Sequence, residues 1–209
     1  MADTEVIVTY YETGEKYLEQ HYVNGILNGK STIWYKDGQK KREVTYVNGQ
    51  FHGDYLSWYE NGNKIVERIY VDGKSHGSVV YWYENGQTQE VEHYTNGIMH
   101  GLHTIWHENG QKDEEVDYFE GKRKGLFCKW YENGEKEEEG FYINDILHGD
   151  WLVWYKHGSI KECYHYVNGK KHGIYKSWYK NGLQKEEYSY IDGILHGRVK
   201  KWNTYGELI

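Results

Sequence analysis

The chain has 209 residues, of which 38% are hydrophobic and 17% aromatic, and its formal net charge is -7. An acidic chain is not an expected partner of nucleic acid, and no apolar run of about 18 residues is present that would span a membrane. The 23 tyrosines and 9 tryptophans argue against disorder, because disordered chains contain few aromatic residues.

A strict 24-residue repeat governs the sequence. Tryptophan recurs at this spacing at Trp34, Trp58, Trp82, Trp106, Trp130, Trp154, Trp178 and Trp202. Glycine follows four residues after each tryptophan, as at Gly38, Gly62, Gly86, Gly110 and Gly134. No residue is inserted or deleted between copies. We therefore expect a single array of about nine units over residues 1–209, with end caps at 1–9 and 203–209.

The unit at residues 54–77 represents the others. Its Asn61-Gly62 dipeptide predicts a hairpin with a type I′ turn, because both central residues of that turn need a positive φ. The turn would join a first strand at 54–59 to a second at 64–71. Residues 72–77 are predicted to form a longer turn to the next unit.

Successive hairpins without long crossovers predict an all-β fold. The expected architecture is a tandem-repeat antiparallel β-meander of 24-residue hairpins. About 17 strands, spaced about 4.8 Å apart, would form an elongated, twisted or curved single-sheet ribbon.

The predicted hairpin assigns side chains to two faces. A two-residue loop would pair Tyr59 with Lys64 and Trp58 with Ile65. One face then carries Leu56, Trp58, Ile65, Glu67 and Ile69. The other carries Tyr55, Tyr59, Lys64, Val66, Arg68 and Tyr70. The tryptophan side is the more apolar, so we expect it to be the packed side.

Charges follow the same period. One column of residues 24 apart is Lys16, Lys40, Lys64, Lys112 and Lys136, and another is Glu90, Glu114, Glu138, Glu162 and Glu186. The two columns lie two residues apart in the unit, so on a strand they would share a face and form ion pairs. A second interpretation is an acidic stripe for a basic partner, strongest in the second half of the chain.

The motif at residues 58–62, 67–73 and 76–77 resembles MORN repeats, in the bacterial-type variant found among antitoxin components and in large DNA viruses. The resemblance covers residues 10 to 206, with departures at Asn28 and Lys124 in the histidine column and at His107 and Asn203 after the tryptophan. It implies a curved or twisted ribbon of hairpins, scaffolding and interaction roles, dimerisation and phospholipid binding. It transfers no catalytic residue.

Catalysis and metal binding have little support in the sequence. A histidine column comprises His52, His76, His100, His148, His172 and His196. Neighbouring copies would lie two strands, about 9.5 Å, apart, which suits a shared zinc ion poorly. Abundant carboxylates occur in every copy, whereas an enzyme site is normally unique. We therefore expect no enzyme activity, no metal site and no cofactor.

Two tyrosine columns are the candidate binding surface. The first tyrosine column follows the tryptophans and comprises Tyr35, Tyr59, Tyr83, Tyr131, Tyr155 and Tyr179. The second tyrosine column comprises Tyr46, Tyr70, Tyr94, Tyr118, Tyr142 and Tyr166. The alternative is that these rings only form the core of a thin sheet.

The expected function is a non-catalytic protein–protein interaction scaffold or adaptor with an extended aromatic-rich surface, of which an antitoxin would be one case. The alternatives are a peripheral phospholipid-binding module and carbohydrate or choline binding. A protein partner is expected, with a homodimer through the terminal repeats as a further hypothesis. The first residues lack the features of a signal peptide, which predicts a cytoplasmic location, the host cytoplasm if the source is viral.

Overall fold

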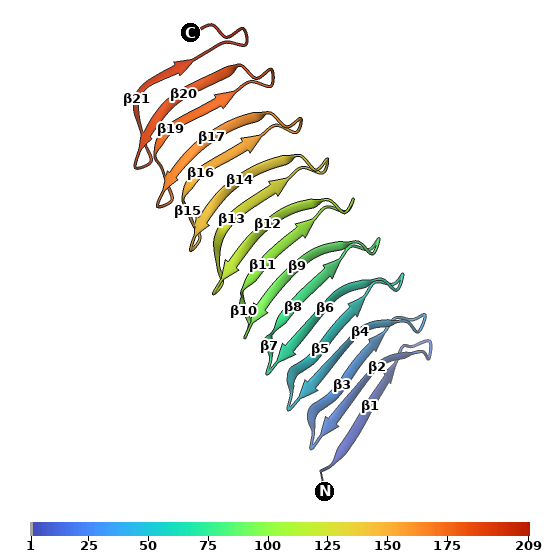
Figure 1. Cartoon of the computed structure of the whole chain (residues 1–209). Coiled ribbons are helices and arrows are strands. Elements are labelled where there is room, and N and C mark those ends of the chain that lie inside the picture. The colour runs from blue at the N-terminus through green and yellow to red at the C-terminus, as the bar shows by residue number, and fades with distance from the viewer. Residues whose placement is uncertain (1) are drawn as a thin grey trace. The chain divides into compact units, whose positions relative to one another are not determined.

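A computed structural model describes residues 2–209, and Met1 of the predicted N-terminal cap lies outside the described residues. The described chain is all-β, and it divides into two compact units, Met1–Gly101 and Leu102–Ile209. In each unit the strands lie side by side in a single layer (Figure 1), and chain neighbours pair antiparallel. The predicted class, an antiparallel meander of 24-residue hairpins, is confirmed.

The first unit contains ten strands. They are β1 (Thr4–Tyr10), β2 (Lys16–Val23), β3 (Ile26–Trp34), β4 (Lys40–Val47), β5 (Gln50–Trp58), β6 (Lys64–Val71), β7 (Lys74–Ser75), β8 (Gly77–Trp82), β9 (Thr88–Thr95) and β10 (Ile98–Met99). In the 54–77 unit, the predicted second strand, 64–71, coincides with β6. The first strand, β5, begins four residues before the predicted strand at 54–59.

The second unit contains the other strands, and only Gly101 of β11 belongs to the first unit. They are β11 (Gly101–Trp106), β12 (Lys112–Phe119), β13 (Lys122–Trp130), β14 (Lys136–Ile143), β15 (Ile146–Leu147), β16 (Gly149–Trp154), β17 (Ile160–Val167), β18 (Lys170–Lys171), β19 (Gly173–Trp178), β20 (Gln184–Ile191) and β21 (Ile194–Lys201).

Four of the 21 strands are two-residue pieces, β7, β10, β15 and β18, and one histidine separates each from the next strand. The backbone N–H of His76, for example, donates a hydrogen bond to the carbonyl of Ile69 at 2.9 Å. Where the strand is continuous, as in β13, the register shifts at the same place, between Val116 and Tyr118 of its partner. When each interrupted strand is counted once, 21 minus 4 gives the predicted 17.

The two turns of each unit are the reverse of the prediction. Asp72 and Gly73 both have positive φ, 48° and 75°, and Val71 pairs with Lys74 across them, as a two-residue type I′ hairpin requires. At the other end only Gly62 has a positive φ, 85°. The Asn61 side chain instead accepts a hydrogen bond from the backbone N–H of Asn63 at 2.9 Å, so the predicted type I′ turn at Asn61-Gly62 is wrong.

The predicted register holds through the hairpin except beside this turn. Ser57 pairs with Val66 and Leu56 with Glu67, but Trp58 pairs with Lys64, so Ile65 is an extra residue in a bulge. The tryptophan face of this unit therefore carries Asp54, Leu56, Trp58, Lys64, Glu67 and Ile69. The tyrosine face carries Gly53, Tyr55, Ser57, Val66, Arg68 and Tyr70. The prediction that Lys64 lies on the tyrosine side is wrong because of the bulge.

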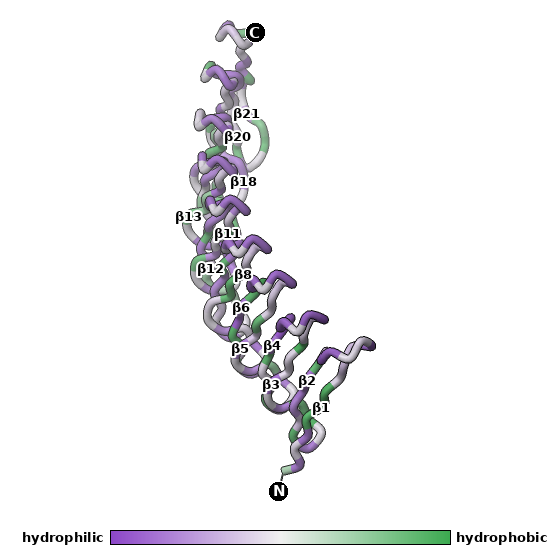
Figure 2. The backbone as a smooth tube through the Cα atoms, turned by 90° about the vertical axis from the view of Figure 1, so that its right-hand side faces the viewer, coloured by the Kyte–Doolittle hydropathy of each residue, from purple (hydrophilic) through white to green (hydrophobic). Residues whose placement is uncertain are grey.

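The core lies on the tyrosine face, not on the tryptophan face as predicted. The most buried apolar side chains are Val44, Val79 and Val116, at most 1% exposed. By the 24-residue period, Val44 and Val116 correspond to Arg68, and Val79 corresponds to Tyr55. Both positions face the tyrosine side. Every tryptophan of the 24-residue column is only half-buried. Figure 2 shows hydrophilic and hydrophobic positions mixed along the strands of each unit, as expected where one thin layer supplies the core.

Candidate functional site

The first tyrosine column links successive repeats. The hydroxyl group of Tyr59 donates a hydrogen bond to the carbonyl of Trp82, in the next repeat, at 3.0 Å. Equivalent bonds of 2.7–2.8 Å are made by Tyr11, Tyr35, Tyr131, Tyr155 and Tyr179. Where the column departs from tyrosine, His107 Nε2 takes the same place, 3.0 Å from the carbonyl of Trp130. These hydroxyl groups therefore serve the fold.

A charged recess lies beside this column in the first unit. Its volume is about 440 Å³, and its lining consists of Tyr11, Tyr35, Lys36, Asp37, Lys41 and Glu60. The ammonium groups of Lys36 and Lys41 lie 5.7 and 5.2 Å from the ring centroids of Tyr11 and Tyr35. The chain's own lysines thus occupy the ring faces that a cationic ligand would use.

The second tyrosine column lies on the tyrosine face, among other rings. In the first unit, Phe51 lies between Tyr46 and Tyr70, with ring centroids 5.0 Å from each, and Tyr55 lies 6.2 Å from Tyr70. Burial, with a smaller contribution from the Glu92 carboxylate, raises the pKa of Tyr94 to about 12. Tyr94 is therefore half-buried and neutral at physiological pH.

The tyrosine face of the second unit also carries aromatic rings. Phe127 stacks on Trp151 at 5.3 Å, and Tyr142 meets both rings edge-on at 5.9 and 6.0 Å. Val116 completes this cluster, against which Tyr118 packs. A second aromatic group comprises Tyr164, Tyr175 and Tyr188. The ring centroid of Tyr175 lies 4.8 Å from that of Tyr164 and 4.4 Å from that of Tyr188. Tyr166 lies 6.2 Å from the first of these rings.

One close packing pair in the second unit was not predicted from the sequence. Gly140 occupies a strand position where other repeats have Val44 or Val116, and the Trp151 ring fills the space that its side chain would take. Two signals were available. Trp151 is the one tryptophan outside the 24-residue column, and Gly140 is the one glycine in its own column.

The tryptophan face carries a repeated charged motif. Lys64 Nζ lies 2.5 Å from the Glu67 carboxylate and 5.5 Å from the ring centroid of Trp82, in the next repeat. The same lysine–glutamate pair forms at Lys16–Glu19, Lys40–Glu43, Lys112–Glu115 and Lys136–Glu139. The partner glutamates are therefore not the predicted column. The bulge turns each lysine to the face of the glutamate three residues on.

We expect opposite pH effects at two glutamates. Hydrogen bonding to Lys40 lowers the pKa of Glu43, so its stabilising contribution is present above the ordinary carboxyl pKa and is lost as pH falls through the lowered value. Burial raises the pKa of Glu114, so its ionised form destabilises the fold at neutral pH. Glu43→Gln should lower the free energy of unfolding at pH 7 by up to about 1 kcal/mol, whereas Glu114→Gln should raise it.

Denaturant unfolding between pH 7 and about pH 3 checks both signs. As the pH falls, the glutamate of the unsubstituted chain becomes protonated, so the free energy of unfolding of each variant should approach that of the unsubstituted chain. Shifts of the same sign at pH 7 would contradict the assignment.

The predicted histidine column lies beside the type I′ turns. His52 Nδ1 lies 3.3 Å from the Asp72 carboxylate, and His172 Nδ1 lies 3.6 Å from that of Asp192, so these histidines contact the type I′ turns.

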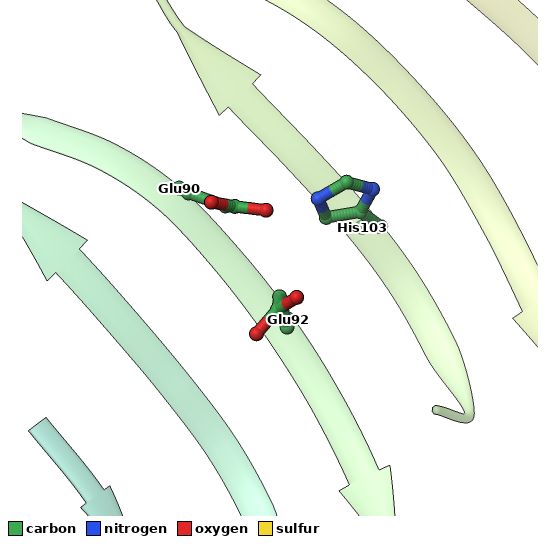
Figure 3. A group of neighbouring side chains, drawn as sticks. All are labelled: Glu90, Glu92 and His103. Carbon is green, nitrogen blue, oxygen red and sulfur yellow. The ribbon is translucent and has the colours of Figure 1, made fainter. Parts of the chain in front are cut away.

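Figure 3 shows Glu90 and Glu92 of β9, whose side chains share a strand face because they are two residues apart, and His103 of β11. The Glu90 column lies on the tyrosine face, since Glu90 pairs with Tyr81.

The fold and the site define a class of protein, an antiparallel β-hairpin repeat array in which a tyrosine hydroxyl group of one copy donates a hydrogen bond to a main-chain carbonyl of the next. The family described as MORN repeat variant matches seven segments, residues 27–48, 51–72, 75–96, 99–120, 123–144, 147–168 and 171–192. These cover more than half of the sequence, and the chain belongs to this family. No curated protein matches the chain. Within residues 2–209 there is no helix long and apolar enough to cross a membrane.

Proposed function

We propose that this MORN repeat protein is a non-catalytic scaffold that binds a protein partner through its tyrosine face. One observation carries the proposal. In each unit the aromatic rings of this face are packed against side chains of the same sheet, and among residues 2–209 no helix or second sheet covers them. An apolar sheet face is normally buried against another layer, so an uncovered one favours a partner.

The chemistry of this face suits a protein. Half-buried tyrosines offer large, rigid and amphipathic contact areas, which is why tyrosine is enriched at interfaces and among their energetic hot spots. The same side chains recur every 24 residues, which supports an extended surface and not a single reaction centre. An antitoxin that covers a toxin would be one case of such a scaffold.

Two neighbouring residues of β6 provide the test. Tyr70 lies on the tyrosine face, and Ile69, which is 44% exposed, lies on the tryptophan face. We expect Tyr70→Lys to abolish capture of a stoichiometric partner from lysate of the native source, whereas Ile69→Lys should retain it. Circular dichroism would establish that both variants are folded.

Two results would overturn the proposal. Capture that survives Tyr70→Lys but is lost with Ile69→Lys would move the surface to the tryptophan face. If no protein is captured and the chain instead sediments with anionic liposomes, the phospholipid alternative is favoured.

A further inference from the structure

A row of carboxylates crosses the tyrosine face of the second unit. Glu138, Glu162 and Glu186 hold the same position in three successive repeats, on β14, β17 and β20. Glu138 and Glu162 both pair with Val153, and Glu162 and Glu186 both pair with Ser177. Residues paired directly across antiparallel strands share a face. These five side chains therefore form one line, which we call the glutamate row.

The charges of the glutamate row are largely withdrawn from water. The side chains of Glu162 and Glu186 are 23% and 22% exposed, and the hydroxyl group of Tyr164 donates a hydrogen bond to Glu162. Their lysine partners, Lys161 at 3.5 Å and Lys201 at 3.2 Å, are about half-exposed, and such pairs contribute little. A carboxylate that is partly shielded from water attracts a bound cation more strongly than it would in bulk water, because the surrounding dielectric is lower.

Ser177 provides an independent sign of a ligand. Its side chain lies in the row between Glu162 and Glu186, and the residue is only 4% exposed. Its Oγ is buried and has no hydrogen-bond partner within residues 2–209. Leaving a buried hydroxyl group without a partner costs about 1–3 kcal/mol, so buried hydroxyl groups are normally satisfied. A donor from a bound molecule would satisfy this one.

The chain itself contains an example of a cation on this face. Lys171 Nζ lies 3.9 Å from the ring centroid of Tyr164 and 5.5 Å from that of Tyr190. Lys171 therefore already covers these two ring faces, as Lys36 and Lys41 do in the first unit, so a cationic ligand would be held by the carboxylates. The carboxylates of the row favour a basic ligand over an acidic one.

The spacing of the row selects the form of that ligand. Equivalent glutamates are two strands apart, about 9.5 Å. A polyproline II chain has three residues per turn and a rise of about 3.1 Å per residue, so every third side chain lies on the same side, about 9.3 Å further along. We propose that the glutamate row binds a basic segment of a protein partner in the polyproline II conformation, with lysine or arginine at every third residue. This proposal rests on the proposed function, because it names the partner chemistry of the same tyrosine face.

Two labelled peptides of one composition test the spacing with the full chain. In one peptide four lysines stand at every third position among serines, and in the other the four lysines are consecutive. Fluorescence anisotropy should show about tenfold tighter binding of the spaced peptide. Equal affinities would mean that net charge alone attracts the peptide, and the proposal would be wrong.

A matched pair of double variants tests the place. The first double variant, Glu162→Gln with Glu186→Gln, removes two carboxylates of the glutamate row. The second, Glu139→Gln with Glu187→Gln, removes two carboxylates of the tryptophan face, one on β14 and one on β20. Both variants change the net charge equally. We expect the first to weaken binding of the spaced peptide about tenfold and the second to change it less than about twofold. Equal weakening would overturn the assignment.

Ser177→Ala is a third variant that needs no charge change. It should weaken the spaced peptide without lowering the melting temperature, because the hydroxyl group has no partner in the fold. If peptide binding fails while Tyr70→Lys still abolishes capture of the native partner, the basic-segment proposal is wrong and the scaffold stands. If neither effect is found, both proposals fail.

Discussion

Replacing Gly140 with alanine is expected to lower the free energy of unfolding by about 3 kcal/mol, the upper part of the range for overpacking a core. A Cβ atom at this position would lie 1.9 Å from Cε3 and 2.5 Å from Cζ3 of the Trp151 ring. That ring is held between Phe127 and Tyr142, so it has little room to move. Alanine would otherwise be preferred to glycine within a strand, so the sign of the effect is diagnostic.

Urea unfolding of the full chain measures this effect, and a double variant controls it. Trp151→Val alone removes packing, but it also vacates the space that a residue-140 side chain needs. The double variant Gly140→Ala with Trp151→Val should therefore be less unstable than the sum of the two single changes. Strict additivity, or a loss below about 0.5 kcal/mol for Gly140→Ala, would contradict the packing described above.

Phe127→Ala should cost about 4 kcal/mol, and Leu126→Ala less than about 0.5 kcal/mol. The two residues are neighbours on β13, and their side chains lie on opposite faces. Phe127 is 7% exposed and stacks on Trp151, whereas Leu126, on the tryptophan face, is 54% exposed. The comparison tests directly which face of the second unit is the core.

Thermal or denaturant unfolding of both variants provides the measurement, with Tyr205→Ala, at an 84% exposed position, as a control for the loss of an aromatic ring. A larger loss for Leu126→Ala than for Phe127→Ala would return the core to the tryptophan face. That result would also remove the basis for placing a binding surface on the tyrosine face.

The fold could be predicted because its determinants are local and repeated. The tryptophan and glycine columns fix the period, and the absence of insertions makes every unit equivalent. The turn types could not be assigned, because both turns of a unit contain Asn-Gly or Asp-Gly and both need glycine at the same place. What distinguishes them is the Asn61 side chain, which accepts a backbone hydrogen bond and makes a positive φ unnecessary there.

The site was predictable in part. The tyrosine columns were identified, but their different roles depend on which atom each hydroxyl group reaches in the next repeat, and a single repeat does not reveal this. The buried face was misassigned because tryptophan is the most apolar of the recurring residues. Lys64 lies over Trp82 and covers it with charge, a contact that arises only because Ile65 is bulged out of register.

The link between repeats has a consequence for how such a chain can change. In each case the donor is a side chain of one unit, but the acceptor is a main-chain carbonyl of the following unit. Every amino acid supplies that carbonyl, so the receiving unit needs no matching side chain. This link therefore sets no sequence condition on the order in which units are duplicated, lost or exchanged, in contrast to a junction such as Gly140 with Trp151, where the side chains of both units must match.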